Sequence, residues 1–123
     1  DRVDDKGRSR ELHTDLALDA IDFKARDQYK TRYTKTLNKS SNIIDCEYFT
    51  INIILVNGEI NIDHSDKDSF VIYMCVDGKV SIKFHHDKKE NLKMGETVLI
   101  PAELDKISMM SKGYSELLEI FIK

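Results

Sequence analysis

Two apolar segments, each marked by glycine, restrict what this chain can fold into. The first, residues 69–78, reads SFVIYMCVDG and ends in the turn signal Asp-Gly. The second, residues 95–102, reads GETVLIPA and separates Gly95 from Pro101 by five residues. A short apolar run that is bounded by turn residues is typical of a strand buried on both faces. The two segments therefore predict strands inside a β-sandwich or barrel.

Apolar and polar residues alternate from residue 46 onward with the period of two that is typical of β-strands. Strands are predicted at residues 49–55, 60–64, 70–76, 80–84, 97–100, 107–109 and 117–122. Turns are predicted at Asn57-Gly58, Asp77-Gly78 and Lys112-Gly113, and residues 86–91 read as a charged loop. Short strands at this spacing predict an antiparallel sandwich or jelly roll, and periodicity alone does not separate a jelly roll from an immunoglobulin-like sandwich.

Residues 1–45 are predicted to hold a linker, an amphipathic helix and an extended basic arm. The helix is expected over residues 12–23, where Leu12, Leu16 and Ala20 form an apolar stripe and Thr14 is the candidate N-cap. The stripe requires a partner, either the outside of the barrel or a neighbouring domain. Residues 24–39 carry six basic side chains. We expect a solvated or domain-contacting arm, with binding of a sugar phosphate and binding of nucleic acid as the alternatives.

Composition narrows the class of protein further. A formal net charge of −3 argues against nucleic acid and anionic membranes as partners, and no apolar run is long enough to span a bilayer. Cys46 and Cys75 match no redox or zinc pattern, so we expect two reduced, buried thiols and a cytoplasmic location. The chain begins with a polar run at Asp1, and we expect it to be part of a longer polypeptide.

The two apolar segments resemble the signature segments of the cupins, which are small β-barrels. We therefore predict a mainly β fold, a cupin-like jelly-roll (double-stranded β-helix) barrel over residues 46–123 with one N-terminal helix. In a metal-binding cupin, an HxH pair and a Glu precede the glycine that aligns with Gly78, and one more His follows the proline that aligns with Pro101. In this alignment His64 is the one ligand that remains, because the Glu position falls at Val71 and the last His position near Lys106. We predict a barrel without a metal site.

Other candidate residues favour structural interpretations. His85 and His86 are adjacent, so in a strand they point to opposite faces and do not chelate one ion. His64 reads as an ordinary surface or hydrogen-bonded residue, and His13 reads as a packing or hydrogen-bonding residue. Asp63, Asp66 and Asp68 read as a solvated loop, with weak calcium binding or acid–base chemistry as the alternatives. We predict no catalytic residue in this chain.

The chain also resembles a particular family. RELHTDLALDAIDF at residues 10–23, SFVIYMCVDG at 69–78 and MGETVLIPAE at 94–103 are similar, in this order, to the C-terminal part of the short bacterial (class I) mannose-6-phosphate isomerases. The resemblance implies an aldose–ketose isomerase that interconverts mannose 6-phosphate and fructose 6-phosphate. It also implies that zinc and the catalytic residues belong to an N-terminal cupin domain that these residues do not include.

The sequence leaves three hypotheses, of which a complete cupin enzyme has the least support, because it would need a metal site that the ligand alignment does not find. In the first, this chain is the non-catalytic C-terminal cupin of such an isomerase. It is then inactive alone and packs on the catalytic domain, and the full-length protein binds the sugar phosphate. Arg2 is the family-matching residue nearest the active site and the candidate for substrate binding, although we favour a linker or interdomain ion pair for it. In the second, the chain is a stand-alone, metal-free cupin that binds a small sugar or metabolite.

Overall fold

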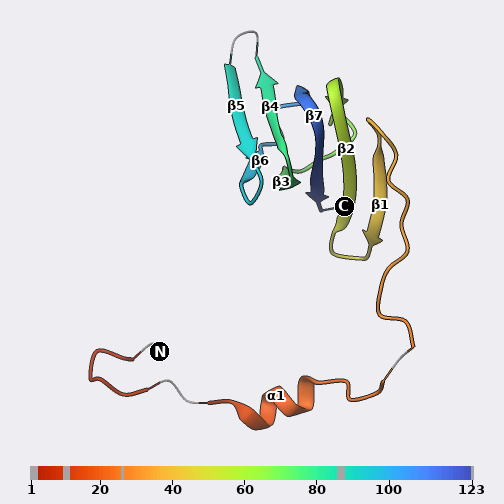
Figure 1. The fold of residues 1–123 in the computed structure, drawn as a ribbon. Coiled ribbons are helices and arrows are strands. Elements are labelled where there is room, and N and C mark those ends of the chain that lie inside the picture. Colours follow the sequence, from red (N-terminus) through yellow and green to blue (C-terminus); the bar gives the residue numbers. More distant parts are fainter. Residues whose placement is uncertain (1–2, 10–11, 26, 86–87, 123) are drawn as a thin grey trace. The chain divides into compact units, whose positions relative to one another are not determined.

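The structure is a computed structural model that describes residues 3–9, 12–25, 27–85 and 88–122 (Figure 1). Within these residues the chain forms one helix and seven strands. They are α1 (Thr14–Ala20), β1 (Ser40–Asp45), β2 (Thr50–Asp63), β3 (Val71–Asp77), β4 (Lys79–Phe84), β5 (Lys88–Lys93), β6 (Thr97–Ile100) and β7 (Lys106–Phe121). The predicted mainly β fold with one N-terminal helix is thus confirmed. The chain divides into two compact units, Asp1–Lys30 and Thr31–Lys123.

The long strands β2 and β7 organise the whole sheet. All strand pairs are antiparallel, and the order along one path is β1-β2-β7-β3-β6. The other half of β7 pairs with β4, and β4 pairs with β5. Two parts of the sheet therefore share β2 and β7. We name them the five-stranded part (β1, β2, β7, β3, β6) and the four-stranded part (β2, β7, β4, β5).

The predicted turns at Asn57-Gly58 and Lys112-Gly113 are both wrong, because β2 and β7 run straight through them. Pairing of β2 with β7 breaks register between Val56 and Gly58 and then resumes. Gly58 has a φ of 77°, so the Asn-Gly pair supports a bulge instead of a hairpin. The backbone N–H of Asn57 donates to the side chain of Asn38 at 2.9 Å rather than across a turn.

Gly78 is the predicted turn that the structure confirms. It lies between β3 and β4 with a φ of 73°, and the chain passes there from the five-stranded to the four-stranded part. A Cβ at this position would lie 2.5 Å from Oγ of Ser115 and 2.7 Å from the carbonyl oxygen of Tyr114. Both the backbone conformation and the close approach of β7 therefore require glycine.

The barrel core lies between the two parts of the sheet. It consists of buried side chains from both: Ile54, Val56, Val71, Tyr73, Cys75, Val80, Ile82, Leu92, Ile100, Ile107, Met109 and Leu117. On β2 the inward face carries Thr50 and Asn52 as well as apolar residues. Large apolar side chains fill most of the interior, and the buried polar side chains include Thr50, His64, Ser111, Ser115 and Glu119. Of the two free cysteines, Cys75 is buried as predicted, whereas Cys46 is only half-buried.

Two predicted boundaries differ from the structure. Residues 40–45 were assigned to the linker region, but they form β1, which pairs with β2 from Ile54 to Thr50. Residues 86–91 were predicted to be a loop, yet β5 begins at Lys88 and pairs with β4. β5 is an edge strand in which only Leu92 is buried, so its charges face solvent and do not oppose strand formation. Its sequence therefore lacks a strand-like apolar pattern.

Helix α1 is shorter than predicted, and Thr14 is not its cap. Thr14 is the first helical residue, and His13 occupies the N-cap position without a side-chain hydrogen bond. The helix ends at Ala20, its C-cap residue Ile21 is extended, and none of the helical residues is buried. The apolar stripe is present in the sequence, but Leu12 and Leu16 are exposed. No helix in the described part of the chain is long and apolar enough to cross a membrane.

The basic arm is attached to the barrel at its C-terminal end. Nζ of Lys35 lies 2.6 Å and 2.7 Å from the two carboxylate oxygens of Glu116. Asn38 adopts a φ of 56° and bonds the backbone of Asn57 through both atoms of its side-chain amide. The C-terminal end of the basic arm therefore contacts the barrel, which agrees with the interpretation of the arm as a domain-contacting segment.

Candidate functional site

A buried polar network lies inside the barrel where β3 and β7 pair. Tyr73 stands directly opposite Glu119, and its hydroxyl donates to Oε1 of the carboxylate at 2.8 Å. Nε2 of His64, in the loop after β2, lies 2.8 Å from the same hydroxyl. Tyr73 is fully buried, and Glu119 and His64 expose only 3% and 4% of their surfaces. The three side chains form a continuous hydrogen-bonded chain that is closed to solvent.

Two further donors hold the other oxygen of Glu119. Oγ of Ser40 donates to Oε2 at 2.7 Å, and Nδ2 of Asn52 donates to it at 2.8 Å. A buried carboxylate is costly unless hydrogen bonds replace its lost hydration. Three donors from β1, β2 and β3 supply those bonds here, so the network fastens four strands of the five-stranded part around one acid.

The protonation state of the network follows from its geometry. Burial, together with the neighbouring Glu119, raises the pKa of Tyr73, so the hydroxyl keeps its proton. Because that proton is donated to Glu119, Nε2 of His64 must carry a hydrogen and donate to the tyrosine oxygen. Burial lowers the pKa of His64, against the opposing effects of the Leu104 carbonyl and Glu119, and favours the neutral ring. The buried Nδ1 of His64 has no hydrogen-bond partner in the described part of the chain.

The sequence prediction reached only one member of this network. His64 was expected to be a surface or hydrogen-bonded residue, and it is hydrogen-bonded and buried. Tyr73, Glu119, Asn52 and Ser40 were missed. The available signal was a single acid between two apolar side chains of the same strand face, Leu117 and Phe121, which flank Glu119 in β7.

The residues at the cupin ligand positions do not fit a metal ion. Val71 lies in the apolar core, and Lys106 is exposed with its Nζ 3.7 Å from a carboxylate oxygen of Asp63. His64 uses Nε2 to contact Tyr73. Within residues 3–9, 12–25, 27–85 and 88–122, no three His, Cys, Asp or Glu side chains gather as metal ligands would. Hydrocarbon and ammonium groups offer no lone pair to a cation, so the donor set is incomplete.

The acidic loop after β2 stabilises its own turn. Oδ1 of Asp63 accepts a hydrogen bond from the backbone N–H of Ser65 at 2.9 Å, and hydrogen bonds from Ser65 are the main cause of the lowered pKa of Asp63. Oδ1 of Asp66 lies 3.4 Å from Nζ of Lys67, while Asp68 is exposed. These contacts agree with the interpretation as a solvated loop.

The remaining candidates lie apart from the network. His13 precedes α1 and is exposed, so its side chain does not pack as predicted. His85 ends β4 with a φ of 47°, and its ring meets that of Phe84 edge-on at 6.0 Å between centroids. His86 and Arg2 lie outside the described residues.

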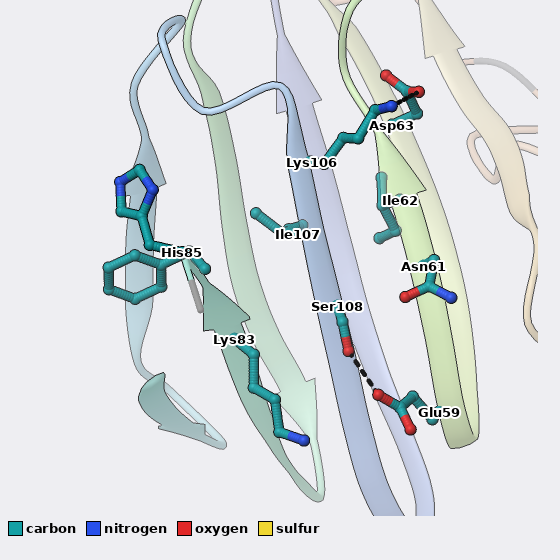
Figure 2. Close-up of a pocket in the computed structure, with 10 residues that line it drawn as sticks. Glu59, Asn61, Ile62, Asp63, Lys83, His85, Lys106, Ile107 and Ser108 are labelled. Carbon is teal, nitrogen blue, oxygen red and sulfur yellow. Dashed lines mark hydrogen bonds and ion pairs between the residues drawn. The ribbon is translucent and has the colours of Figure 1, made fainter. Parts of the chain in front are cut away.

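A separate open groove of about 490 Å³ lies where β4 separates from β7 (Figure 2). It is lined by Glu59, Asn61, Ile62, Asp63, Lys83, Phe84, His85, Lys106, Ile107 and Ser108. Figure 2 shows Ser108 donating to Glu59, at 2.9 Å, and Lys106 paired with Asp63. Paired charges around an apolar floor suit a neutral polar solute better than a highly charged one.

The comparisons with known proteins agree on one family. The family model for the mannose-6-phosphate isomerase cupin domain matches residues 38–117. YvyI, a Bacillus subtilis (strain 168) protein named as a candidate mannose-6-phosphate isomerase, is 29% identical over 106 residues, which are 85% of this chain and 33% of that protein. This chain thus spans about a third of the length of that curated relative.

Solved structures give the same result for the fold. The mannose-6-phosphate isomerase from Bacillus subtilis superposes with a TM-score of 0.66 and 27% identity, covering 99% of this chain and 38% of that one. A cupin-2 domain protein from Shewanella frigidimarina superposes with a TM-score of 0.57 and 17% identity, covering 91% and 94%. These matches confirm the jelly-roll cupin fold. With the family model, they show that this chain belongs to the cupin domain family of the mannose-6-phosphate isomerases.

Proposed function

We propose that this chain is the non-catalytic cupin domain of a mannose-6-phosphate isomerase. In this proposal a second, N-terminal cupin domain of the same polypeptide binds zinc, binds the sugar phosphate and isomerises it. The domain described here supports that catalytic domain and does not turn over substrate alone. The function belongs to cytoplasmic carbohydrate metabolism.

One observation carries the proposal: the polar side chains at the centre of the barrel are hydrogen-bonded to one another, and among their buried atoms only Nδ1 of His64 lacks a partner in the described part of the chain. Glu119 has three donors, and Nε2 of His64 is committed to Tyr73. The remaining ligand positions hold Val71 and Lys106. Around Glu119 the described residues form a hydrogen-bonded network that fastens β1, β2, β3 and β7 together. This is what a structural domain requires.

The length of the Bacillus subtilis isomerase supports the same separation into a catalytic domain and a structural domain. The Bacillus subtilis isomerase matches almost all of this chain with only 38% of its own length. The larger share of that protein therefore lies outside the matching domain, and we place the zinc ligands, the catalytic groups and the substrate contacts of the proposed parent enzyme there.

The alternative function, a stand-alone module that holds a sugar in the barrel lumen, has less support. The inward positions near the network are filled by Tyr73, Met109 and Leu117, each of which is fully buried. A small polar ligand is better accommodated by the open groove between Lys83 and Asp63 than by the interior.

The test is an isomerisation assay on the purified chain. Mannose 6-phosphate is incubated with the chain and added zinc, and fructose 6-phosphate is followed by NMR. We expect no conversion above that of a buffer control. Conversion that scales with protein concentration and disappears in His64→Leu would contradict the proposal, because a contaminating isomerase would not respond to that substitution.

A chimera tests the structural role directly. This chain replaces the matching segment of the Bacillus subtilis isomerase, and the chimera is assayed for zinc content and activity. A structural role predicts that zinc and turnover are both retained. Loss of turnover in a folded, zinc-loaded chimera would instead assign a catalytic contribution to the replaced domain.

A further inference from the structure

The outward side of β4 and β5 gathers lysines, although the chain as a whole has a formal net charge of −3. The two strands lie side by side in Figure 1. Three cross-strand pairs share this side, and they are Lys79–Lys93, Ser81–Asn91 and Lys83–Lys89. The alternate pair, Val80–Leu92, is buried in the core. Two of the three outward pairs therefore place like charges directly opposite each other, which costs stability and which a bound anion would relieve.

A groove of about 510 Å³ lies over one of these lysine pairs. It is lined by Lys79, Val80, Ser81, Asn91, Leu92, Lys93, Glu96, Met110 and Lys112. Lys112, on β7, adds a third ammonium group to those of the Lys79–Lys93 pair. The volume falls within the range of about 300–1,000 Å³ that is usual for sites of small molecules. The lysines thus surround a hollow of the size of a small ligand.

The charges of the groove are only partly balanced within the chain. Nζ of Lys93 lies 3.5 Å from Oε1 of Glu96. In the part of the chain that the structure describes, Lys79 and Lys112 have no ion-pair partner. Three lysines and one glutamate give the groove a net charge of +2. A phosphate monoester carries a charge of about −1.5 to −2 near pH 7, so the two charges complement each other.

Neutral donors and an apolar surface complete the groove. Ser81 stands opposite Asn91 on one side and opposite Met110 on the other. The hydroxyl of Ser81 and the side-chain amide of Asn91 are hydrogen-bond donors of the kind that phosphate oxygens accept. Met110 is half-buried and offers a flexible apolar surface beside them. The groove therefore combines groups that suit an anion with one that suits a carbon skeleton.

We propose that this groove binds the phosphate group of a small organic phosphate. The three ammonium groups neutralise the phosphate, Ser81 and Asn91 donate to its oxygens, and Met110 contacts the organic part. Lysine is depleted in the cores of protein–protein interfaces, so this concave, lysine-rich side suits a small anion better than a contact with a catalytic domain. The inference stands independently of the proposed function, because it requires no turnover and no second domain.

An NMR titration of the purified, ¹⁵N-labelled chain tests the proposal. Glucose 6-phosphate, inorganic phosphate and glucose are added separately at constant ionic strength, because salt screens exposed charges. We expect glucose 6-phosphate to cause saturable shifts at the backbone amides of Ser81, Asn91 and Met110 below about 20 mM. Inorganic phosphate is expected to shift the same amides with weaker binding, because it makes no contact with Met110. Glucose lacks the phosphate and is expected to leave them unshifted.

Two variants and one control show whether the groove itself is responsible. Lys79→Gln and Lys112→Gln each remove one ammonium group from the groove, and each is expected to raise the dissociation constant of glucose 6-phosphate about two- to fivefold. Lys89→Gln is the matched control, because Lys89 is exposed on the same side of β5 and does not line the groove. Far-UV circular dichroism checks that each variant is folded.

The outcomes separate the groove from the general charge of the chain. Weaker binding in both groove variants with an unchanged control supports the proposal. The absence of saturable shifts at the three amides overturns it, and so do shifts of equal size with glucose. An equal loss of affinity in Lys89→Gln also overturns it, because the ligand would then respond to the charge of the whole face. Tighter binding of inorganic phosphate than of the ester would assign the site to the free anion and contradict an organic ligand.

Discussion

Replacing Tyr73 with phenylalanine removes the one atom that joins His64 to Glu119. The hydroxyl bond to the carboxylate is a bond to a charged group, which contributes about 1.5–3 kcal/mol. The ring N–H of His64 is left buried without an acceptor, which costs about 1–3 kcal/mol. Removing the buried hydroxyl itself recovers part of this. We expect Tyr73→Phe to lower the free energy of unfolding by about 2–4 kcal/mol and the Tm by on the order of 10 °C.

Urea unfolding followed by far-UV circular dichroism measures this change. Tyr114→Phe is the matched control, because Tyr114 exposes 66% of its surface on β7 and the same hydroxyl is removed there. The control is expected to stay within about 0.5 kcal/mol of the wild type. If Tyr73→Phe is equally silent, the network does not fasten the strands and the reasoning from its geometry is wrong.

Three further predictions follow from the same structure. Gly78→Ala is expected to lower the free energy of unfolding by more than about 2 kcal/mol, because the new Cβ would collide with β7. Gly95→Ala is expected to cost only about 1–2 kcal/mol of backbone strain, because Gly95 has a φ of 87° and a Cβ at this position would meet no atom within 4 Å. The urea midpoints of the two variants test this difference. Burial lowers the pKa of His64 below its ordinary value of 6.5, so the folded state binds fewer protons than the unfolded state. The free energy of unfolding is therefore expected to have its full value above about pH 6.5 and to fall as the pH drops from there through the pKa of His64 in the folded state. If the free energy of unfolding of a His64→Leu variant falls with the same slope over this pH range, the assignment to His64 is refuted. Asn38→Ala is expected to cost about 1–2 kcal/mol, since it loses both bonds to Asn57 and places alanine at a positive φ; chemical denaturation that shows no change would mean that the arm is not anchored there.

Local patterns predicted most of the strands because burial follows the alternation of side chains along each strand. β3 and β6 were both located from the two glycine-marked apolar runs. The errors arose where a local turn signal competed with long-range pairing. Asn57-Gly58 favours a hairpin in isolation, but β7 pairs on both sides of it and Asn38 bonds its backbone. Neither partner is near in sequence.

The candidate site was less predictable for the same reason. The alignment of ligand positions placed Val71 and Lys106 where a metal-binding cupin has ligands, and neither side chain offers a lone pair to a metal ion. The buried network was invisible, because Tyr73 and Glu119 are separated by 46 residues and meet only through the pairing of β3 with β7. A single acid between two apolar residues of one strand face was the one clue, and its hydrogen-bond donors could be identified only from the fold.

A metal titration tests the central claim most directly. The purified chain is freed of metal with a chelator and titrated with zinc and with cobalt, while calorimetry and the visible absorption of cobalt are recorded. Because the donor set around His64 is incomplete and its Nε2 is engaged by Tyr73, we predict no stoichiometric binding and no cobalt d–d absorption. Binding of one ion per chain that is abolished by His64→Leu would show that the barrel retains a metal centre, and would contradict the account.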